Sequence, residues 1–170
     1  MSTVAIAGAS GVVGSLVLAQ LLEREDVASV IAIGRKAPVC THHKLTPKVV
    51  ELGNRVALVD AIPKGIKVAI CCLGTTMKRA GSKDAFRAVD HDAVVNFAQA
   101  AHAQGAQRFV VVSALGADPG VRSFYLRTKG EAESTLERIG FTQLTILRPS
   151  LIDDEGLRDL PPVWWTPTNA

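Results

Sequence analysis

The sequence has few of the residues that build disulfide frameworks or metal sites. Its three cysteines, Cys40, Cys71 and Cys72, are an odd number, and their spacing fits no metal-ligand motif. Buried, reduced thiols are expected, with a disulfide or a metal site as the alternative. The neighbouring His42 and His43 have no further ligand cluster nearby, so we expect surface histidines and predict no metal site.

Long apolar runs and blocks of one charge are also missing. No apolar stretch approaches the roughly 20 residues that span a bilayer. A strand-like segment stands at the N-terminus, where a signal sequence would carry a charged and then an apolar region. The formal net charge of +3 arises from scattered Lys and Arg residues, and no basic and aromatic platform accompanies them. These absences predict a cytoplasmic protein that binds neither membranes nor nucleic acid.

The sequence does contain enough apolar residues for one domain with a core, since 48% of its 170 residues are hydrophobic. The stretch TVAIAGASGVVG, residues 3–14, organises this domain. Its apolar run at 4–7 predicts a strand buried on both faces. A glycine turn follows, and then a helix whose apolar residues Val13, Leu16, Val17 and Leu21 recur at helical spacing.

The glycines of this stretch each meet a different demand of a phosphate-binding turn. Gly8 allows the tight turn after the strand, Gly11 lets the backbone approach a pyrophosphate, and Gly14 lets the helix pack closely against the sheet. Free N–H groups at the helix start, together with one hydroxyl donor, then point at the phosphates. The alternative is a purely structural turn, because glycines also cluster in turns that bind no ligand. The predicted phosphate-binding residues are Gly8, Ser10, Gly11, Val12, Val13 and Gly14.

A second buried strand, predicted over 29–33, ends in cations where an NAD-binding protein usually carries an acidic residue for the ribose 2′-OH. The residues there are Gly34, Arg35 and Lys36. Arg35 offers a bidentate fork to a 2′-phosphate, and Lys36 offers a point charge. NADP(H) is therefore favoured over NAD(H), with a solvated basic loop as the alternative.

Two further apolar runs, 56–59 and 68–73, predict a third and a fourth strand. The third closes at Asp60, a candidate acceptor for the adenine amino group. The fourth enters a loop at Gly74 and Thr75, where the backbone can pass under the adenosine ribose. Both ends are expected at the carboxyl edge of the sheet, where open α/β folds bind ligands. Plain turn and cap roles are the alternative.

The rest of the chain continues the alternation of helices and strands. An alanine-rich helix is predicted over about 85–104 and a strand over 109–112, which ends at Ser113. A helix that starts at Tyr125 and a strand over 144–147 follow. Tyr125 and Lys129 are four residues apart and share a helical face, where the cation can assist proton transfer by the phenol. The alternative is a chance occurrence, because this spacing is common. Ser113 can donate a hydrogen bond to a substrate oxygen.

The order of five motifs resembles a known family. The motifs are GASGVVG, CCLGTTMKRAG, VDHD, VVVSALGAD and YLRTKGEAE. Together they resemble the atypical short-chain dehydrogenase/reductases, and most of all their small NAD(P)-binding branch that includes the Tat-interacting oxidoreductase-like protein. The resemblance implies an α/β protein with a three-layer, Rossmann-type, doubly wound parallel sheet. It also implies NADP(H) along residues 8–14, Arg35, Asp60 and Gly74.

The family's Ser/Tyr/Lys triad falls on Ser113, Tyr125 and Lys129. Relatives usually carry a second serine after the fifth strand, often the catalytic one, and here that position is Ala114. The resemblance therefore implies an NADP(H)-binding oxidoreductase that acts on a carbonyl or alcohol substrate. The alternative is a non-catalytic NADP(H)-binding sensor whose affinity for a protein partner responds to the cofactor.

The C-terminal stretch departs from the family. A Rossmann domain is predicted over residues 1–150, followed by a short atypical tail over 151–170 in place of the usual substrate region. The tail contains the adjacent Trp164 and Trp165, which suit either a partner surface or packing across the pocket or sheet edge.

Overall fold

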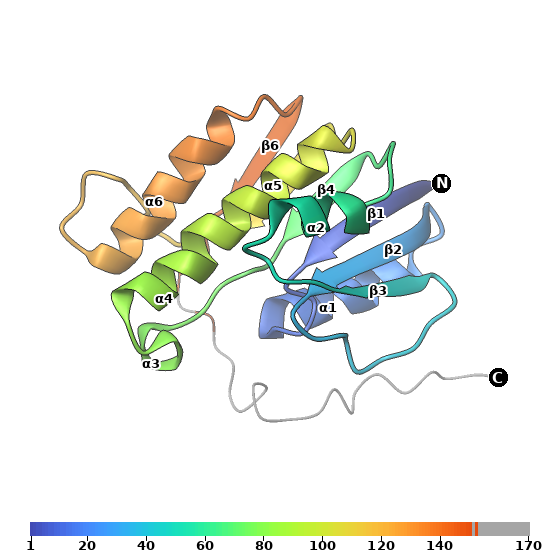
Figure 1. The fold of residues 1–170 in the computed structure, drawn as a ribbon, viewed down its shortest axis with the longest axis horizontal. Coiled ribbons are helices and arrows are strands. Elements are labelled where there is room, and N and C mark those ends of the chain that lie inside the picture. The colour runs from blue at the N-terminus through green and yellow to red at the C-terminus, as the bar shows by residue number, and fades with distance from the viewer. Residues whose placement is uncertain (151, 153–170) are drawn as a thin grey trace.

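The computed structural model describes residues 1–150 and 152 as a six-stranded sheet with helices on both faces (Figure 1). The strand order is β3-β2-β1-β4-β5-β6, and all neighbouring strands are parallel. The strands are β1 (Ser2–Ala7), β2 (Val27–Gly34), β3 (Leu45–Val49), β4 (Val68–Cys71), β5 (Arg108–Val112) and β6 (Gln143–Leu147). The helical segments are α1 (Val12–Glu23), α2 (Arg55–Ala61), α3 (Met77–Ala80), α4 (Lys83–Arg87), the π-helical η1 (Ala88–Ala93), α5 (Val94–Ala103) and α6 (Phe124–Glu137).

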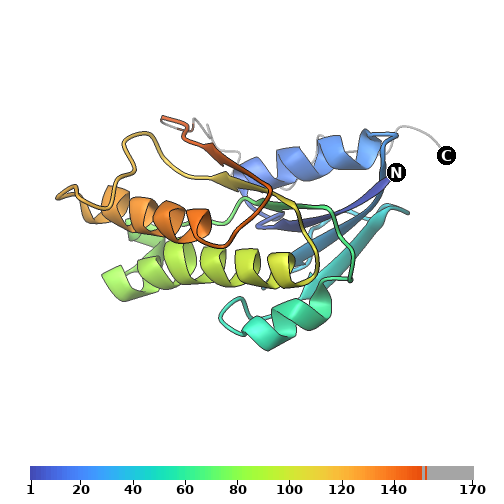
Figure 2. The same ribbon diagram turned by 90° about the horizontal axis from the view of Figure 1, so that it is seen from above.

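The helices divide unequally between the two faces of the sheet. Figure 2 shows α1 on one face, with α2, the α4–α5 rod and α6 on the other. The chain runs outward from β1 to β3, returns to β4 beside β1, and runs outward again to β6. This is the doubly wound arrangement, and the predicted three-layer Rossmann-type fold is confirmed.

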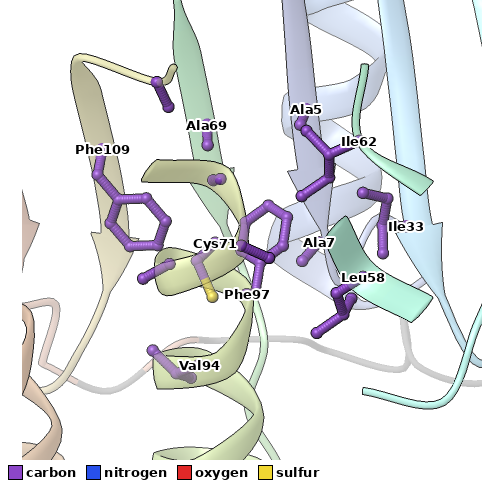
Figure 3. Close-up of a cluster of buried hydrophobic side chains, with 14 of the residues drawn as sticks. Ala5, Ala7, Ile33, Leu58, Ile62, Ala69, Cys71, Val94, Phe97 and Phe109 are labelled. Carbon is purple, nitrogen blue, oxygen red and sulfur yellow. The ribbon is translucent and has the colours of Figure 1, made fainter. Parts of the chain in front are cut away.

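The period-two alternation of β1 explains why two different layers pack on it. Val4 and Ile6 belong to the core beneath α1, together with Leu18 and Leu22 of that helix. Ala5 and Ala7 belong to the opposite core, which α2 and α5 cover and where Phe97 is fully buried (Figure 3). The side chains are therefore larger on the α1 side of β1 and smaller on the α5 side.

The buried face of α1 differs by one position from the predicted face. Leu18 and Leu22 are 2% exposed, whereas Leu16 is 44% exposed. Val17 and Leu21, which were expected on this face, pack at its margin. Gly14, also buried, lies on the same stripe as Leu18 and Leu22 at four-residue spacing, so the helix turns its smallest residue toward the turn.

The predicted third strand at 56–59 is wrong, because this segment lies in helix α2. The side chain of Asn54 caps the helix by accepting a hydrogen bond from Ala57 N–H at 3.1 Å. Only one face of the apolar run is buried: Leu58 is 0% exposed and Val56 is 70% exposed. A capped segment with one buried face is a helix, and it provides the crossover that a parallel connection from β3 to β4 requires.

The third strand lies earlier, at β3, inside the polar connection where the sequence indicated only a short strand at 49–50. Its side chains are mostly exposed, so it lacks the apolar run that reveals a buried strand. Pro47 pairs opposite Ala32, which is tolerated because β3 is an edge strand of the described sheet.

Several features expected from composition can be placed on the structure. The three cysteines are free, with Cys71 buried and Cys40 and Cys72 partly buried. Among the described residues, no group of three or more His, Cys, Asp and Glu side chains is arranged to hold a metal ion. No helix in residues 1–150 has the length and apolarity that crossing a bilayer requires.

Candidate nucleotide-binding cleft

A cleft of about 380 Å³ lies at the carboxyl ends of β1, β4 and β5. At this edge the helical connections that follow β1 and β4 leave the sheet on opposite faces (Figure 2). In doubly wound sheets this switch point is the place where ligands bind. Its walls come from segments far apart in the sequence. They are residues 11–13, residues 72–77, Arg79, Asp90, residues 112–113, Tyr125, Lys129 and residues 149, 150 and 152.

The turn between β1 and α1 is held by close backbone contacts that exclude a Cβ atom. Gly8 has a φ of +83°, and a Cβ there would lie 2.7 Å from the carbonyl carbon of Cys72. A Cβ on Gly14 would lie 2.0 Å from the carbonyl oxygen of Gly8. Gly14 therefore permits contact between the helix and the turn itself, whereas the sequence had suggested contact between the helix and the sheet. The strand, turn and helix form one close-packed unit.

Gly11 differs from these two glycines because the fold does not exclude a side chain there. Its φ is −85°, and a Cβ would lie 3.4 Å from the Gly8 oxygen, an ordinary contact. Gly11 lines the cleft with Val12 and Val13, and no side chain caps the N-terminus of α1. The cleft thus faces an uncapped helix start with the positive end of its dipole, an arrangement that fits a pyrophosphate. Ser10 is exposed beside it.

Arg35 and Lys36 follow β2 at the same edge of the sheet, as predicted, and both are exposed. Neither forms an ion pair with another residue of the described ranges, so both cations are available to an anionic ligand. Asp60 is different. It is an exposed residue of α2 and follows no strand, so the expectation of an adenine acceptor at a strand end is wrong for it.

The loop after β4 contributes backbone groups to the cleft. Cys72 N–H donates to the carbonyl of Ala7 at 2.8 Å, which joins this loop to the end of β1. Thr75 N–H donates to Oδ2 of Asp90 at 2.9 Å. Gly74 lies between, where a Cβ would be 3.5 Å from Asp90 Oδ1. The predicted Gly74 and Thr75 therefore do lie at the cleft. Thr75 is held there by its hydrogen bond to the carboxylate of Asp90 in η1.

Lys129 is a buried member of an ion pair. Its Nζ lies 2.6 Å from Oδ1 of Asp90, and the two side chains are 7% and 0% exposed. Burial raises the pKa of Asp90, while Lys129 and the Thr75 N–H oppose that shift. The positive charge of Lys129 is thus balanced by the carboxylate of Asp90. The spacing in the sequence predicts a cation beside Tyr125 but does not predict this counter-ion.

Tyr125 and Ser113 line the cleft with Lys129. The ring of Tyr125 rests against the buried Phe86 of α4, with 5.5 Å between ring centroids, and the residue is 37% exposed. Ser113 is 5% exposed, and its hydroxyl has no hydrogen-bond partner among the described residues. A buried hydroxyl without a partner is costly, so a ligand oxygen that reaches it gains a ready donor.

Helix α6 is held against the loop that follows β5. A Cβ on Gly130 would lie 2.4 Å from the backbone of Asp118, so the helix can approach that loop only at a glycine. On the same helix, the buried Glu133 forms a bidentate ion pair with Arg148 at the end of β6. These two contacts fix the helix that carries Tyr125 and Lys129.

Asp90 is not among the predicted site residues, although the sequence contains a signal for it. Asp90 precedes Ala93, Val94 and Phe97 by three, four and seven residues, which places a carboxylate on the apolar face of a helix. A buried carboxylate requires a partner. The sequence did not reveal that the partner is Lys129, because the two residues come together only through the packing of α6 on η1.

The fold and the cleft define a class, the Rossmann-type doubly wound α/β domains with a ligand cleft at the carboxyl edge of the sheet. A family model described as NAD(P)H-binding matches residues 8–161. The chain belongs to this NAD(P)H-binding family. The protein HTATIP2 of Rattus norvegicus is 33% identical over 165 residues, which cover 95% of this chain and 67% of its own length. The mitochondrial protein fmp52 of Aspergillus clavatus is 36% identical over 166 residues, which cover 95% of this chain and 71% of its own. The resemblance inferred from the motifs is confirmed.

Solved structures show the same fold in longer proteins. A short chain dehydrogenase from Burkholderia cenocepacia in complex with NADP superposes with a TM-score of 0.74 at 20% identity, over 95% of this chain and 77% of its own. The Bordetella bronchiseptica enzyme WbmH in complex with NAD⁺ superposes with a TM-score of 0.71 at 22% identity, over 87% and 56%. The chain thus spans about half the length of WbmH and about two thirds of the length of HTATIP2.

Two expectations are not tested by these comparisons. The tail over 151–170, with Trp164 and Trp165, lies outside the described residues apart from residue 152. The cytoplasmic location stays a prediction, since the fungal relatives carry the word mitochondrial in their names.

Proposed function

We propose that the protein is an NADP(H)-dependent oxidoreductase that acts on a carbonyl or alcohol substrate. One observation carries this proposal: a single cleft brings the uncapped start of α1 together with Ser113, Tyr125 and Lys129. The first group of residues suits a phosphate, and the second suits proton transfer beside a bound oxygen.

The start of α1 lines the cleft, whereas Arg35 and Lys36 follow β2 at the same edge of the sheet and are not among the cleft's lining residues. The helix start at 11–13 would hold the pyrophosphate, and Arg35 with Lys36 would hold a 2′-phosphate, because the guanidinium fork matches phosphate geometry. The neighbouring structures include complexes of other proteins with NADP and with NAD⁺. The preference for NADP(H) in this chain therefore rests on Arg35 and Lys36.

The side chains on the opposite wall supply the proton and the orientation. When bound, the nicotinamide ring would give or take a hydride at the substrate carbon. Tyr125 would donate the proton to the carbonyl oxygen, and the Ser113 hydroxyl would hold that oxygen in place. Lys129, whose charge Asp90 balances, would mainly hold its neighbours in position.

A binding titration tests the cofactor assignment. NADPH and NADH are titrated separately into the natural protein and into the Arg35→Ala variant, with calorimetry as the readout. We expect the variant to bind NADPH about 10-fold more weakly or worse, because one charged hydrogen-bonded contact is lost, and to bind NADH as the natural protein does. Arg24→Ala is the matched control, since Arg24 precedes the same strand at the opposite edge of the sheet. Equal affinities for NADPH and NADH in the natural protein would refute the role of Arg35.

The Tyr125→Phe variant tests the catalytic assignment. The phenyl ring keeps the contact with Phe86 and loses only the hydroxyl. We expect turnover of a reducible carbonyl substrate to fall by about 10²-fold or more, with NADPH affinity unchanged within about 2-fold. Single-turnover oxidation of NADPH, followed by absorbance, is the measurement. Unchanged turnover in this variant would sink the assignment.

A second candidate function, a cofactor-responsive sensor, is favoured by the residue that follows the cleft-lining Ser113. Position 114, where relatives usually carry a serine, is a buried alanine and provides no hydroxyl. A sensor would bind NADP(H), turn over no member of a broad carbonyl panel, and change its affinity for a protein partner when the cofactor binds. Partner binding that ignores NADPH would remove this candidate.

A further inference from the structure

The carboxylate of Asp90 contacts two separate walls of the cleft. Its Oδ1 lies 2.6 Å from Lys129 Nζ on α6, and its Oδ2 accepts the N–H of Thr75 in the loop after β4 at 2.9 Å. Asp90 is 1% exposed. One carboxylate oxygen of Asp90 thus forms an ion pair and the other accepts a hydrogen bond. This single side chain connects η1, α6 and the loop after β4.

This carboxylate lies in a π-helical turn. The helical segment from α4 to α5 passes through η1, where the wider turn accommodates one extra residue. Asp90 is buried in this turn, whereas Asp92 of the same turn is exposed and contacts His91 at 2.7 Å. π-turns inside helices occur frequently at functional sites.

A buried ion pair costs desolvation energy that the attraction between its charges only partly recovers. Stabilisation of the fold is therefore a weak explanation for the Asp90–Lys129 pair. We propose that Asp90 is a positioning residue, which holds Lys129 in place for the nicotinamide half of the dinucleotide. This inference rests on the proposed function. It assigns Asp90 no contact with the ligand, because the residue acts through Lys129.

The geometry limits the effect to one part of the cleft. Asp90 lies beside Gly74, where a Cβ would be 3.5 Å from Oδ1 and 3.7 Å from Lys129 Nζ. The other part, formed by the start of α1, has its own fixed backbone at Gly8 and Gly14. Loss of Asp90 should therefore weaken a ligand that reaches Lys129 and spare one that does not.

Two ligands separate these parts. NADPH carries the nicotinamide, whereas adenosine 2′,5′-bisphosphate carries only the adenosine and its phosphates. Both are titrated calorimetrically into the natural protein and into Asp90→Asn, which keeps an oxygen for Thr75 N–H and removes the charge opposite Lys129. We expect NADPH affinity to fall about 10-fold or more and the bisphosphate affinity to stay within about 2-fold. Asp92→Asn, two residues away on the surface, should change neither affinity.

Each other result overturns the inference. Equal losses for the two ligands indicate a general structural defect, and equal retention means that Asp90 positions nothing. A loss in Asp92→Asn as large as that in Asp90→Asn means that η1 as a whole is disturbed. Failure of the natural protein to bind NADPH refutes the proposed function instead, so the two failures are distinguishable.

A second variant covers the case in which Asp90→Asn does not fold. The double change Asp90→Asn with Lys129→Met removes both charges, and we expect its melting temperature to return toward that of the natural protein, because no unpaired buried charge remains. The double variant should bind adenosine 2′,5′-bisphosphate within about 2-fold of the natural protein and NADPH about 10-fold more weakly or worse. Equal losses for the two ligands in the double variant overturn the inference.

Discussion

The two walls of the cleft are built by different means. The wall at β1 and α1 is local: residues 8–14 form it from backbone, and its close contacts leave no room for a Cβ at Gly8 or Gly14. The wall at α6 is assembled from side chains of segments tens of residues apart, joined by the Asp90–Lys129 pair. A short sequence motif can encode the first wall, whereas the second exists only when the whole domain is packed.

This difference predicts different consequences of mutation on each side. On the local wall, a methyl group added at Gly8 or Gly14 should disrupt both the fold and ligand binding, because the turn and the helix are in direct contact there. On the assembled wall, removal of a polar group should change chemistry while the fold persists. The two walls meet at the end of β4, where Cys72 lines the cleft.

The largest effect is expected for Gly14→Ala on the local wall. The added Cβ would lie 2.0 Å from the Gly8 oxygen, so the helix must move away from the turn. We expect a loss of about 3 kcal/mol in the free energy of unfolding, measured with urea, together with loss of NADPH binding. Gly53→Ala is the matched control, because nothing lies within 4 Å of a Cβ there. A Gly14→Ala protein as stable as the control would contradict the close contact.

A smaller effect of opposite sign is expected for Ser113→Ala on the assembled wall. The substitution removes a buried hydroxyl that has no partner in the described part of the chain. We expect the free protein to gain up to about 1 kcal/mol in the free energy of unfolding, while turnover decreases. Ser82→Ala is the comparison, since Ser82 caps α4 and its loss should cost about 1 kcal/mol. Destabilisation of Ser113→Ala to the same extent would mean that its hydroxyl has a structural partner.

The smallest effect concerns Cys72, between the two walls. Burial raises the pKa of its thiol to about 11, above the ordinary value near 9, so little thiolate forms at pH 8. We expect iodoacetamide to modify it slowly at pH 8 and faster as the pH rises, as followed by mass spectrometry. The neutral thiol's contribution to stability is fully present below about pH 9 and is lost as the pH rises toward about 11. Modification at pH 8 as fast as for the less buried Cys40 would contradict this burial.

The sequence predicted the elements that have a local pattern. The buried strands β1, β2, β4 and β5 were found from their apolar runs, and the glycine turn was found from its spacing. The exposed edge strand β3 carries no such run, and the apolar segment 56–59 resembles a strand until Asn54 caps it as a helix. The apolar run predicts a strand that ends at Asp60, whereas Asp60 lies in helix α2.

The residues of the chain by themselves determined that a strand, a glycine turn and a helix come first, that two cations follow the second strand, and that Tyr125 and Lys129 share a helical face. These features depend on neighbours within a few positions, where sterics and helical periodicity act. Only the tertiary structure decided that Lys129 meets Asp90 and that Gly130 lets α6 approach the loop at Asp118. It also decided that the hydroxyl of Ser113 is buried with no partner among residues 1–150 and 152. Those features depend on how distant segments pack. Burial of a polar or charged group has a large energetic effect only once folding has removed that group from water.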